Sequence, residues 1–322
     1  MLRKVLVLAA ALVLAAGGPA LASGEAKHPR NIAYSFEGPF GKFDQAQMQR
    51  GFKVYREVCA ACHSMNLVSF RNLADRGGPF YDPHYPNAND NPYAKTIAAE
   101  YQVGDIDSET GDTIQRPGTT ADRFPAPYPN EAAARAGNGG ALPPDLSVLA
   151  KARSGGPAYI ASLLSGYVNP PAGLEVPVGQ YYNPYMPGDV SSAWKGAGHA
   201  PEGGFIAMPP PLTPGLVAFD DGTPSTIDQQ AKDVSAFLMW AAEPKLGERK
   251  QMGFADGLPA ALRRPALRQL QAGLAERVAL GRPWPAGPSA LSAGRAFMRS
   301  KGSQTAAGCA SEAPSASLRT SC

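Results

Sequence analysis

The five residues from Cys59 to His63 constrain this chain more than any other stretch. They read Cys-Ala-Ala-Cys-His, with two thiols three positions apart and an imidazole directly after them. This pattern is typical of covalent c-type haem attachment, in which both cysteines form thioethers to the haem and the histidine binds its iron. The sequence therefore predicts one covalently bound haem c, attached through Cys59 and Cys62, with His63 as an axial ligand.

Zinc sites and redox dithiols also contain a Cys-x-x-Cys pair. A structural zinc site needs a second pair of ligands, and the other two cysteines, Cys309 and Cys322, stand thirteen positions apart near the end of the chain. A redox dithiol has no use for the adjacent histidine. Both alternatives explain less of the motif than haem does.

The first 22 residues have the pattern of a secretory signal peptide. Arg3 and Lys4 precede an apolar run over residues 5–16, and Ala20-Leu21-Ala22 forms a small-residue cleavage site. The run is shorter than the roughly 20 residues that a membrane helix needs. We therefore expect cleavage after Ala22 and export to the periplasmic face of a bacterial inner membrane, where haem c is attached.

Charge is distributed unevenly along the chain. Residues 23–254 contain 24 Asp and Glu against 19 Lys and Arg, whereas residues 255–322 contain 3 against 9. An acidic haem region suits docking to a basic redox partner such as a cytochrome c, because opposite charge raises the encounter rate. A solvated surface without a partner would have the same composition. No nucleic-acid partner is expected.

Two helices are predicted from capping and periodicity. One begins after Asp44, with Gln47 as the capping-box partner, and the other begins after Thr226, with Gln229 in that role. Their apolar positions recur at helical spacing, at Met48, Phe52, Tyr55 and Cys59 in the first helix and at Ile227, Ala231, Val234 and Leu238 in the second. Gly51 would let another helix cross the first one closely.

A shorter helix is predicted over residues 157–167, and Pro- and Gly-rich loops connect the helices. One helix leading into the haem motif and another closing the domain form the skeleton of a cytochrome c. The expected fold is mainly α, a class I cytochrome c-like helical fold around covalent haem c with long irregular loop insertions. Residues 75–140 carry no clear pattern.

The sixth iron ligand decides the chemistry, because a His/Met pair favours electron transfer and an open position favours binding of small molecules. Met186 and Met208 both lie in proline-braced loops, and the three prolines after Met208 restrain the backbone more firmly than the one after Met186. Met208 is therefore the preferred ligand. The other candidates are Met65, Met239, Met252, Met298, His28, His84 and His199.

A set of motifs then points to one family. They are SFEGPFG (35–41), CAACHSM (59–65), GALPPDLS (140–147), KAR (151–153), YYNPY (181–185), AMPP (207–210), DDGTP (220–224) and FLMWAAEP (237–244). Together they resemble cytochrome c1, the haem c subunit of the cytochrome bc1 complex. The resemblance covers about residues 31–254.

The resemblance implies further residues and partners. It implies Met208 as the axial ligand, and Arg153 and Tyr159 as contacts of the haem propionates, although Tyr159 would also suit core packing. It implies a one-electron relay that accepts an electron from the Rieske iron-sulfur protein and passes it to a cytochrome c. Quinol oxidation would take place on cytochrome b, so this chain would have no substrate chemistry of its own.

The chain departs from the family pattern after Gly253. We expect a haem domain over residues 23–243 and a charged segment over 244–254, but an atypical basic tail over 255–322 replaces the expected membrane anchor. Arginines interrupt every apolar window there, at positions 263, 264, 268 and 277. Our hypothesis is that a frame change near Phe254 produced this tail, and a genuine basic surface helix is the alternative.

Three other functions share the motif. A freestanding periplasmic cytochrome c is usually much smaller, and a dihaem peroxidase would need a second Cys-x-x-Cys-His segment, which this sequence lacks. A haem-based sensor of small ligands would leave the sixth position open. Carbon monoxide binding separates the sensor from the electron carriers.

Overall fold

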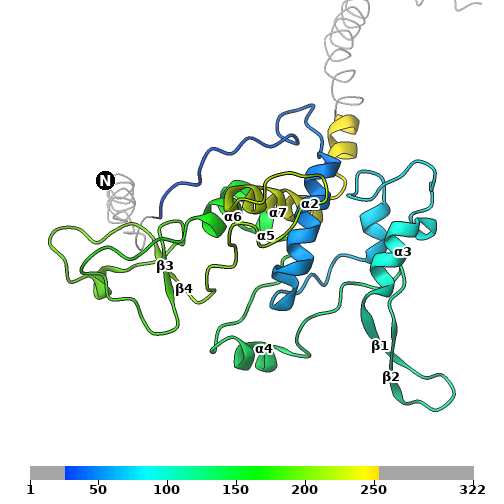
Figure 1. Cartoon of the computed structure of the whole chain (residues 1–322), viewed down its shortest axis with the longest axis horizontal. Coiled ribbons are helices and arrows are strands. Elements are labelled where there is room, and N and C mark those ends of the chain that lie inside the picture. The colour runs from blue at the N-terminus through cyan, green and yellow to red at the C-terminus, as the bar shows by residue number, and fades with distance from the viewer. Residues whose placement is uncertain (1–25, 254–322) are drawn as a thin grey trace, which may run out of the picture. The chain divides into compact units, whose positions relative to one another are not determined.

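The computed structural model describes residues 26–253, which belong to the first of two units of the chain, Met1–Gly257 and Leu258–Cys322. Its helices and strands are α2 (Gln45–Glu57), α3 (Pro92–Ala99), β1 (Gln102–Ile106), β2 (Thr113–Pro117), α4 (Glu131–Gly137), α5 (Leu149–Ala152), α6 (Gly156–Ser165), β3 (Tyr181–Asn183), β4 (Gly204–Ile206) and α7 (Ile227–Ala242). Single 3-10 turns occur at Cys59–Ala61, Phe70–Ala74, Ala88–Asp90 and Ser191–Ala193. Helix predominates, which confirms the predicted mainly α class (Figure 1).

Helices α2 and α7 begin where their N-caps predict. The carboxylate of Asp44 accepts the backbone N–H of Gln47 at 3.1 Å, and the hydroxyl of Thr226 accepts that of Gln229 at 3.2 Å. The predicted return bond of each capping box is wrong, however. The side-chain amides of Gln47 and Gln229 both donate to Asp233 instead.

The two long helices cross at Gly51 (Figure 1). A Cβ atom on Gly51 would lie 2.1 Å from the carbonyl oxygen of Asp233 and 2.7 Å from the Cβ of Phe237, both on α7. These distances leave no room for any side chain. The prediction that Gly51 allows a close helix crossing is therefore confirmed.

A buried carboxylate fastens this crossing. Asp233 is 0% exposed and accepts hydrogen bonds from Gln47 Nε2 at 2.9 Å and from Arg50 Nε at 2.7 Å, both on α2. Gln229 Nε2, one turn earlier on α7, donates to both carboxylate oxygens. Three donors offset the cost of removing the charge from water. The network also fixes the register of α2 against α7.

Replacing Asp233 by Asn should lower the free energy of unfolding by about 2–3 kcal/mol, because Arg50 then loses a buried charged partner. Chemical denaturation monitored by circular dichroism measures the change. Asp228→Asn is the matched control, since Asp228 pairs with Arg30 on the surface and its loss should cost less than about 1 kcal/mol. Equal losses of unfolding free energy in the two variants would show that the buried network stabilises the fold no more than a surface ion pair does.

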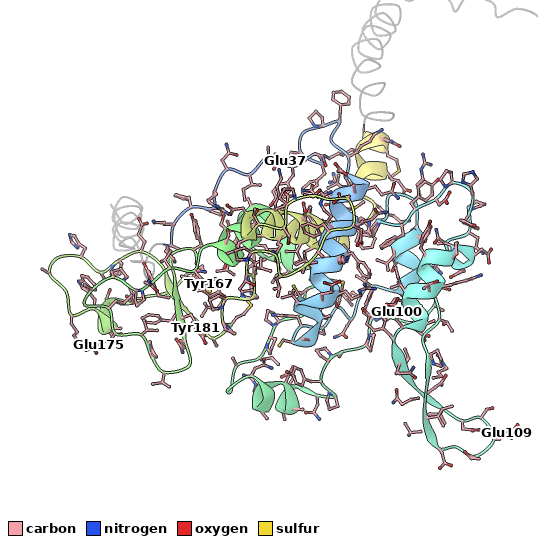
Figure 2. All side chains as sticks on the ribbon, in the orientation of Figure 1. Glu37, Glu100, Glu109, Tyr167, Glu175 and Tyr181 are labelled. Carbon is pink, nitrogen blue, oxygen red and sulfur yellow. The ribbon has the colours of Figure 1, made fainter. Side chains whose placement is uncertain are left out.

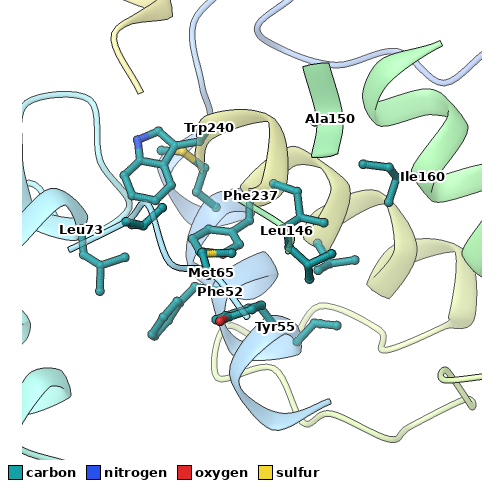
Figure 3. Close-up of a cluster of buried hydrophobic side chains, with 14 of the residues drawn as sticks. Phe52, Tyr55, Met65, Leu73, Leu146, Ala150, Ile160, Phe237 and Trp240 are labelled. Atoms are coloured by element: carbon teal, nitrogen blue, oxygen red, sulfur yellow. The ribbon is translucent and has the colours of Figure 1, made fainter. Parts of the chain in front are cut away.

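The core packs between these helices. Phe52 and Tyr55 of α2 contact Phe237 of α7, with ring centroids 5.6 and 5.7 Å apart (Figure 3). Trp240 stacks on Phe237, and Met65 is fully buried in the same cluster. The apolar face of α2 therefore leads through packed aromatic rings directly into the haem motif, as its periodicity predicted.

Helix α6 packs against α7 and corresponds to the helix predicted over residues 157–167. Pro157 lies in its first turn, where a missing N–H costs nothing, and Gly166 caps its end. Tyr159, Ile160 and Ala161 are buried. The four-residue helix α5 precedes it and has no counterpart among the sequence predictions.

Two small antiparallel sheets lie outside the helical core. Strands β1 and β2 form a largely exposed hairpin, with Glu109 in the turn at its tip (Figure 2). Strands β3 and β4 pair Tyr181 with Ile206 and Asn183 with Gly204. The hairpin and the helices α3 and α4 all lie within residues 75–140, for which the sequence made no prediction.

The last described residues return to the N-terminal segment. Residues 246–253 are helical, and Lys250 Nζ donates to the carbonyl oxygens of Phe36 at 2.5 Å and Gly38 at 2.6 Å. Within residues 26–253 no helix is long and apolar enough to cross a membrane. The predicted signal peptide and basic tail fall outside the described residues.

Candidate haem-binding site

The haem motif begins immediately beyond the end of α2. Val58 caps that helix, and Cys59–Ala61 forms a 3-10 turn in which the backbone N–H groups of Cys62 and His63 both donate to the carbonyl oxygen of Cys59, at 3.1 and 2.9 Å. The turn brings both thiols and the imidazole into one compact segment. Because α2 is anchored in the core, the segment has a rigid support.

Cys59 lies in a buried setting that disfavours its thiolate form. Burial raises the pKa of Cys59 to about 12, and Cys62 adds to the increase. Redox dithiols and zinc ligands rely on thiolates, whose pKa is lowered. Within residues 26–253, no group of three or more His, Cys, Asp or Glu side chains could hold a metal ion by itself. An apolar setting of this kind suits an uncharged thioether.

His63 is oriented by a backbone carbonyl. Its Nδ1 lies 2.8 Å from the carbonyl oxygen of Pro144, which can only accept, so Nδ1 carries the proton. Burial lowers the pKa of His63, although Pro144 and Asp145 oppose the effect. A neutral imidazole with Nδ1–H engaged leaves the lone pair of Nε2 available for a metal, which is the usual arrangement of a ligating histidine.

Asp145 fixes the loop that supplies this carbonyl. Its carboxylate accepts from the hydroxyl of Ser64 and the backbone N–H of Asn66, both at 2.8 Å, and from the N–H of Ser147 at 2.8 Å. Burial acts to raise the pKa of Asp145, but these hydrogen bonds outweigh it and the pKa falls below its ordinary value. The carboxylate therefore stays ionised and locks residues 144–147 against the motif.

Most alternative axial ligands lie in unsuitable positions. Met65 is 0% exposed in the core, Met239 packs partly buried on α7, and Met252 is 59% exposed. His84 is exposed and pairs with Asp82, and His28 and His199 are exposed as well. Met298 lies outside the described residues. Among residues 26–253, Met186 and Met208 remain.

Both remaining methionines emerge from the same small sheet. Met186 follows β3, where its backbone N–H donates to the carbonyl oxygen of Asn183 at 3.1 Å, and Met208 follows β4. Both side chains are half-buried. Pro209, Pro210 and Pro211 follow Met208, whereas Pro187 alone follows Met186. The preference for Met208 stays a prediction.

Arg153 and Tyr159 lie close together around the turn between α5 and α6. Arg153 caps the end of α5 and is exposed, and within residues 26–253 its guanidinium has no ion pair or hydrogen bond. Tyr159 is 9% exposed; burial raises its pKa, and the nearby charge of Arg153 opposes this. An exposed guanidinium beside a buried phenol can bind a carboxylate such as a haem propionate.

The sequence did not single out Pro144 or Tyr167 as site residues. Pro144 acts through its carbonyl oxygen, and Tyr167 through a hydroxyl that donates to the carbonyl oxygen of Met208 at 3.0 Å. Pro144 does fall within a motif of the family resemblance, which was the available signal for that loop. Tyr167 lies just after the end of α6, and nothing in the sequence around it indicated a role in the site.

These features fit a haem c. The donor set consists of the two cysteines of the motif, an imidazole with a free Nε2, and the guanidinium of Arg153, which has no ion pair within residues 26–253 and could bind a carboxylate. A mainly helical fold that carries Cys-x-x-Cys-His at the end of one of two crossed helices defines the class of c-type cytochromes.

Comparison with known proteins makes the assignment specific. The sequence matches the Cytochrome C1 family over residues 34–259, and the chain belongs to that family. It is 44% identical over 265 residues to "Cytochrome c1" of Rhodospirillum rubrum, which covers 77% of this chain and 87% of that protein. It is also 46% identical over 227 residues to "Cytochrome c1, heme protein, mitochondrial" of Saccharomyces cerevisiae, over 70% of this chain and 65% of that one.

Another relative is longer and has a compound name. "Cytochrome b/c1" of Bradyrhizobium diazoefficiens is 44% identical over 268 residues, which cover 77% of this chain and 36% of that protein. The chain thus spans about a third of this relative's length and about two thirds of the yeast protein's length.

Proposed function

We propose that the protein is the electron-transfer haem subunit of a ubiquinol:cytochrome c oxidoreductase, the cytochrome bc1 complex. It accepts one electron from a Rieske iron-sulfur protein and passes it to a cytochrome c. The observation that carries the proposal is the segment from Cys59 to His63 on a helix end, in a chain of the Cytochrome C1 family. A bound haem c would supply reversible one-electron chemistry at its iron.

The residues of this chain bind and tune that group and carry out no acid, base or nucleophilic step. Cys59 and Cys62 attach it, and His63 presents Nε2 from a fixed orientation. Met208 would be the second protein ligand of the iron and would thereby keep other ligands out. The guanidinium of Arg153 would neutralise a propionate of the group, and the hydroxyl of Tyr159 would donate a hydrogen bond to it.

Two observations support the proposed partners. The name of the Bradyrhizobium protein joins a cytochrome b to a c1 in one chain, which supports cytochrome b as a neighbour of this chain. Five acidic residues and no basic one lie between positions 100 and 112, most of them on the exposed β1–β2 hairpin. Such a charge suits a basic cytochrome c as the electron acceptor. The proposed location is the periplasmic face of the inner membrane.

Carbon monoxide binding to the reduced protein tests electron carrier against sensor. If Met208 closes the sixth position, carbon monoxide should bind slowly or incompletely, because the thioether must leave first. Stopped-flow absorbance after mixing the dithionite-reduced protein with carbon monoxide measures this. Rapid stoichiometric binding would favour a sensor of small ligands and contradict the proposal.

Membership in the complex has its own test. Gentle solubilisation of membranes that express the tagged chain should yield cytochrome b and a Rieske protein with it, identified by mass spectrometry and by b-type absorbance. Recovery of the haem-loaded chain without either partner would favour a freestanding carrier.

A further inference from the structure

The three prolines after Met208 stiffen the segment locally, but they leave it few main-chain N–H groups with which to bind the rest of the protein. They are Pro209, Pro210 and Pro211, none of which has a backbone N–H. Between Met208 and Pro211, only Met208 can donate from the main chain. The segment must therefore be fixed from outside, through its carbonyl oxygens or its side chains.

Tyr167 supplies such an attachment. Its hydroxyl donates to the carbonyl oxygen of Met208 at 3.0 Å in a partly buried setting. Among the hydrogen bonds of residues 26–253, this is the one bond made by the backbone of Met208 to Pro211. Burial raises the pKa of Tyr167, and the neighbouring Tyr181 and Tyr159 add to the increase, so the hydroxyl stays a donor at neutral pH.

Tyr167 is itself held by the end of α6. Gly166, which precedes it, packs so tightly that a Cβ there would lie 2.4 Å from Cδ2 of Tyr185. Nearby, the side-chain amide of Asn183 donates to the carbonyl oxygen of Leu163 at 2.8 Å and ties β3 to the same helix end. Tyr167 and Tyr181 lie close together there (Figure 2).

These contacts form a closed series that begins and ends at the C-terminal end of α6 and includes Met208. The end of α6 binds β3 through Asn183, β3 pairs with β4, and β4 leads to Met208, whose carbonyl oxygen returns to Tyr167 just beyond α6. Removing the Tyr167 hydroxyl removes the last contact of this series, the hydrogen bond to the carbonyl oxygen of Met208. The other contacts should still hold β4 in place. The peptide that carries the Met208 thioether, however, would lose its hydrogen bond to the rest of the protein.

We propose that Tyr167 is a positioning residue that keeps Met208 in its ligating geometry through the Tyr167 Oη–H to Met208 carbonyl hydrogen bond. The inference rests on the proposed function, because it takes Met208 as the axial ligand. It adds a residue that acts on the iron only through the main chain of Met208. Without this bond, the thioether should leave the iron more often.

The test compares Tyr167→Phe with the wild type in the haem-loaded full chain. Loss of one neutral hydrogen bond should raise the fraction of protein with a dissociated methionine about five-fold. The rate of carbon monoxide binding to the reduced protein, which is proportional to that fraction, should rise by the same factor. The weak far-red absorption of the sulfur–iron bond in the oxidised protein should disappear at lower temperature than in the wild type.

Tyr182→Phe is the matched control. The Tyr182 hydroxyl donates to the carbonyl oxygen of Glu202 at 2.5 Å, beside the same small sheet but away from Met208. Its loss should leave carbon monoxide binding unchanged. Equal acceleration in both variants, or none in Tyr167→Phe, overturns the positioning role.

A double variant separates positioning from general loosening of the fold. In Met208→Leu the thioether is absent, so adding Tyr167→Phe should no longer change the binding rate. An acceleration that persists in this background overturns the inference, because it cannot act through Met208. A wild type without the far-red absorption overturns the proposed ligation itself, and the inference with it.

Discussion

Met208→Leu should lower the midpoint potential of the haem by a few hundred mV, within the range of about 0.8 V that axial ligands span. Leucine has nearly the volume of methionine, so the loop should keep its packing. It has no atom that can bind iron. Loss of the thioether removes the ligand that favours the reduced state, which is why the potential should fall. Equilibrium redox titration followed by the haem absorbance measures it.

Met186→Leu is the control for this prediction. Met186 leaves the same small sheet, is also half-buried and is also followed by proline. The variant should keep the wild-type potential within experimental error. An unchanged potential in Met208→Leu would remove Met208 from the site, and a fall in Met186→Leu alone would assign the ligand to Met186.

Gly51→Ala should prevent stable folding of the haem domain. The new methyl group would lie 2.1 Å from the carbonyl oxygen of Asp233 and 2.7 Å from Cβ of Phe237. Neither neighbour is the end of a flexible side chain, so α2 and α7 must move apart along their whole contact. We expect a loss of about 4 kcal/mol or more, beyond the usual cost of overpacking. Thermal unfolding and the yield of haem-loaded protein measure it.

Gly247→Ala offers a control of opposite sign. Gly247 is also helical, but a Cβ there would meet nothing within 4 Å. Alanine in an open helical position should stabilise the protein by up to about 1 kcal/mol. Similar thermal midpoints for the two variants would contradict the close crossing at Gly51.

The starts of the long helices could be predicted because their signals are local. Asp44 and Thr226 each accept a backbone N–H three residues later, and this depends only on nearby sequence. The return bonds were wrong because both glutamine side chains donate to Asp233 instead. Gln229 reaches Asp233 one turn along the same helix, whereas Gln47 reaches it only because α2 and α7 cross. For Gln47 that partner lies 186 positions away.

The exposed hairpin β1–β2 could not be foreseen for another reason. Its strands bury almost nothing, so they carry no alternation of apolar and polar residues that would mark them. The bonds from His63 to Pro144 and from Tyr167 to Met208 end on carbonyl oxygens, which every residue possesses. The pattern of side chains in a sequence therefore cannot predict which backbone carbonyl oxygen will accept such a hydrogen bond. The motif itself could thus be recognised in the sequence, and the groups that orient His63 and Met208 could not.

The most direct test of the account is near-infrared magnetic circular dichroism of the oxidised, purified protein, because the energies of its charge-transfer bands identify both axial ligands of a low-spin haem. We expect the pattern of one imidazole and one thioether, from His63 and Met208. A pattern of two nitrogen ligands, or of a high-spin iron with an open position, would contradict the electron-transfer site described here.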